Sequence, residues 1–118
     1  MKPIWKIFSI YMLTLLFMLI CASAFGQVKV IQFNAKWNDV NKVKWCTSKQ
    51  LTDCKVLYID IGENTKAQKK YNVVVVPTII VLHDGEEVKR YQADLSFKML
   101  ATRKKVQELI DELLMEDF

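Results

Sequence analysis

The chain is poor in the residues that usually mark metal centres and interdomain linkers. Its 118 residues include one histidine, three cysteines, three glycines and two prolines. The histidine, His83, stands beside an Asp84-Gly85 pair, where a half-exposed residue at a strand end is the simplest interpretation. A metal site would need more ligands than Cys46 and Cys54 can add. We therefore expect no metal and no other cofactor, and no linker divides the chain.

The sequence also lacks a run of like charge. Its formal net charge is +4, and removal of Lys2 and Lys6 leaves 15 basic against 13 acidic residues. The lysine pairs at 69–70 and 104–105 are most simply solvated faces of helices. This near balance excludes nucleic acid and an anionic membrane surface as expected partners.

The first 26 residues have the organisation of a signal peptide. Lys2 and Lys6 give a positive start, and residues 7–20 form an apolar run. Residues 22–24, Ala-Ser-Ala, are typical of a signal cleavage site. Residues 1–26 therefore predict an export signal and are set aside from the reasoning about the fold.

Cleavage after Ala24 or after Gly26 would release residues 27–118 as a single small domain, either periplasmic or secreted. One alternative is an uncleaved membrane anchor over residues 7–25, because this stretch approaches the ~18 apolar residues of a spanning helix. Another is a lipoprotein signal with Cys21 as the lipidated residue, which the bulky residue before it disfavours. Only an uncleaved segment would make the membrane a partner.

Apolar periodicity predicts the first half of the domain. Residues 28–33 and 56–61 are apolar enough to be buried strands. The chain between them has the length of a right-handed crossover, which makes the two strands parallel neighbours. We expect a short helix to begin at Asn38-Asp39 and to bury Val40, Val43 and Leu51.

The second half of the domain is predicted from proline and glycine turn signals as well as from apolar periodicity. Residues 64–71 predict a short polar helix, and Pro77 divides the apolar run 73–82 into a loop and a strand. Asp84-Gly85 predicts a hairpin between antiparallel strands. Apolar residues at helical spacing over 106–114 predict a C-terminal amphipathic helix. The expected order is βαβαββα, an α/β domain with a four-stranded mixed sheet and flanking helices.

Several segments of the chain resemble a known family. Residues 33–42, Phe-Asn-Ala-Lys-Trp-Asn-Asp-Val-Asn-Lys, resemble the thioredoxin active-site segment, and residues 60–78 look like the stretch that leads to the thioredoxin cis-proline. The hairpin at 84–86 and Leu95-Ser96 also match in position. The chain is identified as a member of the thioredoxin-like superfamily with a minimal thioredoxin fold. It lacks the additional N-terminal strand and helix and carries a short insertion around residues 97–102.

The resemblance also shows what is missing for disulfide exchange, which needs a thiolate nucleophile and a second, resolving thiol. Asn38 and Asn41 stand at those two places, and a carboxamide has no ionisable nucleophile. The family's buried carboxylate and relay lysine correspond to Gln32 and Val56. We therefore expect a domain that is not a disulfide-exchange enzyme, because a fold alone does not confer an activity.

Cys46 and Cys54 leave three interpretations open. They form a structural disulfide if the preceding helix ends near Leu51 and the chain turns back, because on one continuous helix they would lie about 12 Å apart. Otherwise they are two unpaired, half-buried thiols. The third interpretation is a relocated redox pair, and it supports the alternative function of an atypical thiol-disulfide oxidoreductase in cell redox homeostasis.

The remaining candidate site is a surface for a protein or extended peptide partner. In thioredoxins the residue before the cis-proline offers backbone groups to an extended substrate, and such pairing does not depend on cysteine. The asparagine side chains could hold a peptide through their donors and acceptors, or Asn38 could simply cap its helix. The candidate ligand-binding residues are Trp37, Asn38, Asp39, Val40, Asn41, Val76 and Pro77. We expect a binding or chaperone-type module, or an accessory subunit that uses this face as an interface.

Overall fold

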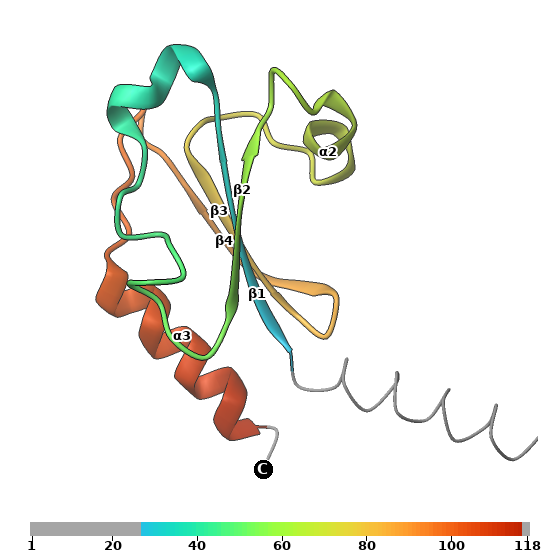
Figure 1. The fold of residues 1–118 in the computed structure, drawn as a ribbon, viewed down its shortest axis with the longest axis vertical. Coiled ribbons are helices and arrows are strands. Elements are labelled where there is room, and N and C mark those ends of the chain that lie inside the picture. The colour runs from blue at the N-terminus through green and yellow to red at the C-terminus, as the bar shows by residue number, and fades with distance from the viewer. Residues whose placement is uncertain (1–26, 117–118) are drawn as a thin grey trace, which may run out of the picture.

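The computed structural model describes residues 27–116. Its elements follow the expected order, with a four-stranded mixed sheet and helices on both faces (Figure 1). The strands are β1 (Val28–Asn34), β2 (Lys55–Asp60), β3 (Thr78–His83) and β4 (Glu86–Gln92), and the helices are η1 (Lys36–Asn41), α2 (Thr65–Lys70) and α3 (Arg103–Glu116). The expected signal segment, cleavage site, anchor and lipidation site lie outside the described residues.

The sheet order is β2-β1-β3-β4. β1 pairs in parallel with β2 and antiparallel with β3, and β3 pairs antiparallel with β4. Asp84 and Gly85 join the last two strands with φ of 53° and 84°. Two successive left-handed residues match the twist of a tight hairpin, which is why the sequence signal was reliable here.

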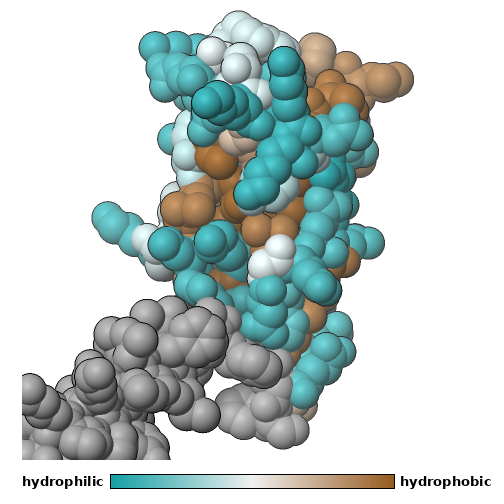
Figure 2. Space-filling model, turned by 90° about the vertical axis from the view of Figure 1, so that its right-hand side faces the viewer, coloured by the Kyte–Doolittle hydropathy of each residue, from teal (hydrophilic) through white to brown (hydrophobic). Residues whose placement is uncertain are grey.

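Two apolar clusters lie on opposite faces of the sheet. The larger one joins β1 and β3 to α3 through Val106, Ile110 and Leu113. The smaller one lies on the α2 face and contains Phe33 and Ile80. Figure 1 shows the long α3 along one face and the short α2 near one end of the other. Figure 2, seen from the α2 side, shows apolar side chains between hydrophilic ones on the face that this short helix leaves uncovered.

The helix expected from Asn38 to Leu51 is the main correction to the fold. η1 is a 3-10 helix that ends at Asn41, and residues 42–54 continue as turns and bends. Val43 and Leu51 are buried as predicted, but Val40 is 85% exposed. The apolar spacing indicated the correct buried residues at two of three positions and the wrong backbone conformation.

No helix within residues 27–116 is long and apolar enough to cross a membrane.

Candidate functional site

The sheet register brings the two halves of the candidate site together. Phe33 near the end of β1 pairs with Thr78 at the start of β3. The segment that follows β1, which includes η1, therefore lies beside the segment that precedes β3, which includes Val76 and Pro77. The direct contact is a hydrogen bond of 3.3 Å from Asn38 Nδ2 to the Val76 carbonyl.

Three asparagines form a network at this junction. Asn38 Nδ2 also donates to Asn34 Oδ1 at 3.1 Å, and Asn41 Nδ2 donates to Asn38 Oδ1 at 2.8 Å. Asn34 Nδ2 donates to the Asn38 carbonyl at 3.2 Å. Both Asn34 and Asn38 are buried, with 0% and 2% exposure. An amide has two donor hydrogens, so the donors of the Asn38 side chain are fully used inside the protein.

Helix capping does not account for Asn38. The residue that caps η1 is Ala35, and no side chain caps that end. Asn38 instead joins η1 to the loop before β3. Its buried side chain is not accessible to a peptide, so Asn38 would support a binding surface from below.

Asn34 is the member of the network that the sequence analysis missed. It is the last residue of β1, where a polar residue usually marks only the end of a strand. Burial raises the pKa of the Tyr58 phenol on β2, and the side chain of Asn34 acts on this phenol in the opposite direction. The available signal was a third asparagine four residues before Asn38, at a spacing that places it beneath the turn.

Gln32, which the resemblance matches to the family's buried carboxylate, anchors the segment after η1. Its Oε1 accepts from the Val43 N–H at 2.8 Å, and its Nε2 donates to the Val43 carbonyl at 3.2 Å. Gln32 is 1% exposed. A neutral amide satisfies both backbone groups at once, which an ionised carboxylate cannot do because it only accepts.

The Val76-Pro77 peptide bond is cis, which the sequence left open. The Thr78 hydroxyl donates to the Val75 carbonyl at 2.6 Å, and the Ala93 N–H donates to the Pro77 carbonyl at 3.1 Å. Val76 and Pro77 are both buried. Hydrogen bonds on both sides thus hold this loop against the sheet.

The outer surface of η1 is apolar and exposed. Trp37 is 66% exposed and Val40 is 85% exposed, with Asp39 exposed between them. The ring of Phe97 meets the Trp37 ring edge-on, with centroids 5.2 Å apart and planes at 86°. Phe97 is 42% exposed in this position.

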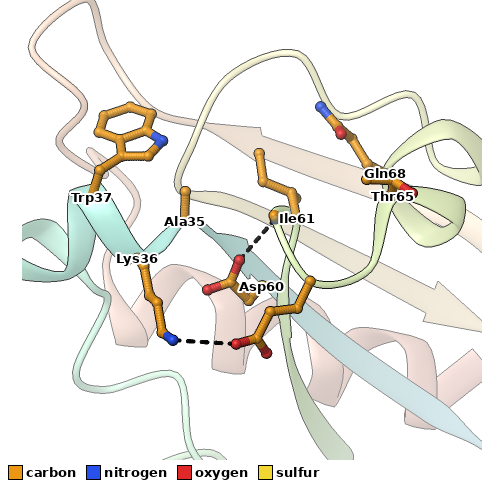
Figure 3. A pocket seen from close by; sticks show the side chains of 9 residues that line it. Ala35, Lys36, Trp37, Asp60, Ile61, Thr65 and Gln68 are labelled. Carbon is orange, nitrogen blue, oxygen red and sulfur yellow. Dashed lines mark hydrogen bonds and ion pairs between the residues drawn. The ribbon is translucent and has the colours of Figure 1, made fainter.

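A cavity of about 490 Å³ opens beside Trp37 (Figure 3). Its walls are residues 35–37, residues 60–63 at the end of β2 and in the loop that follows, and Thr65 and Gln68 of α2. Lys36 Nζ lies 3.4 Å from Glu63 Oε1 across its rim. This position, beyond the carboxyl ends of two parallel strands, is where open α/β sheets commonly bind ligands.

Cys46 and Cys54 lie away from this surface, in the cluster between the sheet and α3. Both are free thiols in the structure. Burial raises the pKa of Cys46 to about 12, with a further contribution from the charge of Cys54. Burial, followed by the charge of Asp53, raises the pKa of Cys54 to about 11. The chain turns back near Asp53, as a bridge requires, and the pairing itself stays a prediction.

The comparisons with known proteins agree with this geometry. A family model described as Thioredoxin matches residues 23–105. The thioredoxin of Bacillus subtilis (strain 168) is 37% identical over 60 residues, which are 51% of this chain and 52% of that protein. The chain therefore aligns with about half the length of this curated relative.

Solved thioredoxin structures align over more of the chain. A mutant thioredoxin of Halobacterium salinarum NRC-1 is 26% identical with a TM-score of 0.60, covering 75% of this chain and 76% of that one. The Fasciola hepatica thioredoxin is 27% identical with a TM-score of 0.55, covering 81% and 89%. With the family model spanning most of the sequence and the sheet, the cis-proline loop and the active-site turn in their places, the chain belongs to the thioredoxin family.

Proposed function

We propose that this chain is an exported thioredoxin-like domain that does not catalyse disulfide exchange and instead binds a protein or extended peptide. The observation that carries the proposal is the asparagine network at the place of the redox cysteines. Asn38 is buried, and its side chain holds Asn34, Asn41 and the Val76 carbonyl together. A disulfide exchanger needs an accessible thiolate at this place, and here a structural amide occupies it.

The alternative, an oxidoreductase that uses Cys46 and Cys54, has less support. The relatives are named thioredoxins, which favours a redox role, but burial raises the pKa of the Cys46 thiol to about 12, and only the ionised thiolate attacks a disulfide. Cys46 is also 4% exposed, so a partner disulfide has little access to it. Both features slow the attack that begins disulfide exchange.

The exposed face of η1 supports binding. Trp37 and Val40 offer apolar contact area, and the adjoining cavity is large enough for a side chain of a partner. Among the described residues, the N–H of Val76 donates to no protein group, although Val76 itself is buried. Main-chain pairing beside an apolar surface is a common mode of peptide recognition. The near-balanced charge fits a protein partner better than a polyanion.

Export is proposed from residues 1–26 alone, with the periplasm or the exterior as the destination. The membrane-anchored alternative over residues 7–25 changes the location and not the proposed activity. N-terminal sequencing of the protein recovered from its native host distinguishes the two. A mature chain that begins at Phe25 or Gln27 supports cleavage, and an intact N-terminus supports the anchor.

Two assays test the function. In a thiol-dependent disulfide reduction assay, we expect no turnover by the wild type. Turnover that disappears in Cys46→Ser would establish the oxidoreductase instead.

In an aggregation assay with a chemically unfolded protein, we expect the wild type to delay aggregation and Trp37→Ala to lose this effect. Met115→Ala is the control, because Met115 is 74% exposed on α3, away from η1. Equal loss in both variants would contradict the proposed surface.

A further inference from the structure

The loop after β4 is attached to the candidate site at its first residue. β4 ends at Gln92, and the next N–H, of Ala93, donates to the carbonyl of Pro77 at 3.1 Å. The loop then passes beside η1 before it reaches α3 (Figure 1). The insertion expected around residues 97–102 begins in the same region. We call residues 93–98 the strap.

One carboxylate organises the strap. Asp94 Oδ1 accepts from the Ser96 N–H at 2.9 Å, from the Ser96 hydroxyl at 2.7 Å and from the Lys98 N–H at 3.0 Å. The backbone closes the same turn, because the Asp94 N–H donates to the Lys98 carbonyl and the Phe97 N–H donates to the Asp94 carbonyl, both at 3.0 Å. The strap is therefore a defined turn, although its side chains are largely exposed.

The turn holds Phe97 in an unfavourable conformation. Its φ is +63°, in the left-handed region that is unfavourable for a residue with a side chain. Strain of this kind persists only where surrounding contacts impose it. In this conformation the ring of Phe97 makes an edge-to-face contact with Trp37, the arrangement that aromatic pairs prefer. Leu95, two residues earlier in the strap, makes no such contact and is fully exposed.

We infer that the strap is a built-in occupant of the binding surface and that Phe97 stands where an aromatic side chain of the partner binds. This inference rests on the proposed function and specifies it. The partner is an extended segment with an aromatic side chain, which displaces Phe97 from the edge of Trp37. Because the strap competes intramolecularly, the apparent affinity for the partner is the intrinsic affinity multiplied by the fraction of molecules in which the strap is released.

The first test asks whether Phe97 shields one edge of Trp37 from solvent. The full chain carries Phe97→Asn, because asparagine tolerates a left-handed backbone and keeps the turn. We expect acrylamide to quench Trp37 fluorescence more strongly in this variant than in the wild type. Subtraction of the signal of a Trp37→Phe protein isolates Trp37 from the other tryptophans. Leu95→Asn is the control in the same strap and should leave quenching unchanged. Equal quenching in the wild type and Phe97→Asn would overturn the inference.

The second test uses the strap's own sequence as the probe. A synthetic peptide of residues 93–99, Ala-Asp-Leu-Ser-Phe-Lys-Met, is titrated against the wild type and Phe97→Asn, with Trp37 fluorescence and calorimetry as readouts. We expect binding to Phe97→Asn to be at least about tenfold tighter than to the wild type. The same peptide with alanine in place of phenylalanine should not bind.

The outcomes separate this inference from the proposed function. Equal affinity of the two proteins for the peptide, or equal binding of the phenylalanine and alanine peptides, would overturn the strap as an occupant. The delay of aggregation by the wild type would then still stand as evidence for a binding module. Loss of that delay, together with no peptide binding by either protein, would overturn both.

Discussion

At the scale of single residues, amide side chains stand where the resemblance to thioredoxins implies reactive groups. Asn38 and Asn41 stand where the cysteines would be, and Gln32 stands where the buried carboxylate would be. In each case the side chain binds other parts of the protein at distances between 2.8 and 3.3 Å. The sequence identified all three positions, but the bonds of Asn38 to Val76 and of Gln32 to Val43 depend on how separate segments meet. A buried amide is stabilising only when its donors and acceptors are satisfied, and here they are.

Replacement of Asn38 by alanine should lower the free energy of unfolding by about 2 to 3 kcal/mol, because it leaves buried groups of Asn34 and Val76 without their partner. Asn41→Ala removes one bond at a half-buried position, where water can substitute, and should cost less than about 1 kcal/mol. Urea denaturation of both variants measures the difference. Similar losses would show that the network does not stabilise the site.

Gln32→Glu should make stability depend on pH. The new carboxyl is buried, so its pKa is raised and the acid form is favoured in the folded state. In acid, the protonated carboxyl donates to the Val43 carbonyl, so the free energy of unfolding is close to that of the wild type. It falls by about 2 to 3 kcal/mol as the pH rises to neutral, because the buried group must then ionise.

The chain offers a matched control in Gln107, whose side chain binds the N–H and carbonyl of Thr52 at 2.9 and 3.1 Å on the surface. Gln107→Glu should lose much less stability at neutral pH, because its carboxylate stays hydrated. Urea denaturation at acid and neutral pH compares the two variants. If both variants lost equal stability at neutral pH, burial of Gln32 would not be the cause of the loss.

At the scale of elements, the segment after η1 shows how a tertiary contact overrides a local pattern. A helix through Val43 would need its N–H and its carbonyl for the helical ladder. Gln32 binds both groups, and Lys42 already leaves the helical region with ψ of 135°. The chain therefore buries Val43 and Leu51 from turns. The apolar spacing encoded which residues are inside and not how the backbone carries them there.

The strap should loosen in acid. Hydrogen bonds to Asp94, from the Lys98 backbone first and the Ser96 side chain second, hold the pKa of this carboxyl below its usual range. Because the pKa is lower in the folded protein, the ionised Asp94 stabilises the strap above the unfolded pKa of about 3.9. This stabilisation is lost as the pH falls below that value. We expect acrylamide quenching of Trp37 to increase below that pH. Asp94→Asn keeps an acceptor but does not titrate, and it should abolish this pH step. A step that persists in Asp94→Asn would assign it to another carboxyl.

At the scale of the whole molecule, stability rests on a small core divided by the sheet. The larger cluster depends on α3, which adds three buried apolar side chains to those of β1 and β3. The face beside α2 has a smaller cluster under a helix of six residues. Small domains have a low free energy of unfolding. We therefore expect the contacts of α3 with the larger cluster to contribute most to it.

Ile110→Ala should lower the free energy of unfolding by about 2 to 4 kcal/mol, because Ile110 is 0% exposed and the substitution leaves a cavity between α3 and the sheet. Met115→Ala, on the same helix but 74% exposed, should change it by less than about 0.5 kcal/mol. Thermal and urea unfolding measure both. A small effect of Ile110→Ala would mean that α3 contributes little to the cooperative unit.

Much of this protein follows from its sequence alone. Apolar runs and helical spacing predicted the buried strands and the C-terminal helix, because they record which faces are buried. The Asp84-Gly85 pair predicted the hairpin and its last strand. The substitutions at Asn38 and Asn41 were also visible, since they need only the position of the segment.

The tertiary structure decided the rest. It joined Asn38 to Val76, bound Val43 to Gln32 and set Phe97 on Trp37. Each of these contacts links residues that are far apart in the chain, so it depends on sheet register and on the path of irregular segments. Local pattern does not encode either one. They are fixed only when the whole core packs and every buried polar group must find a partner.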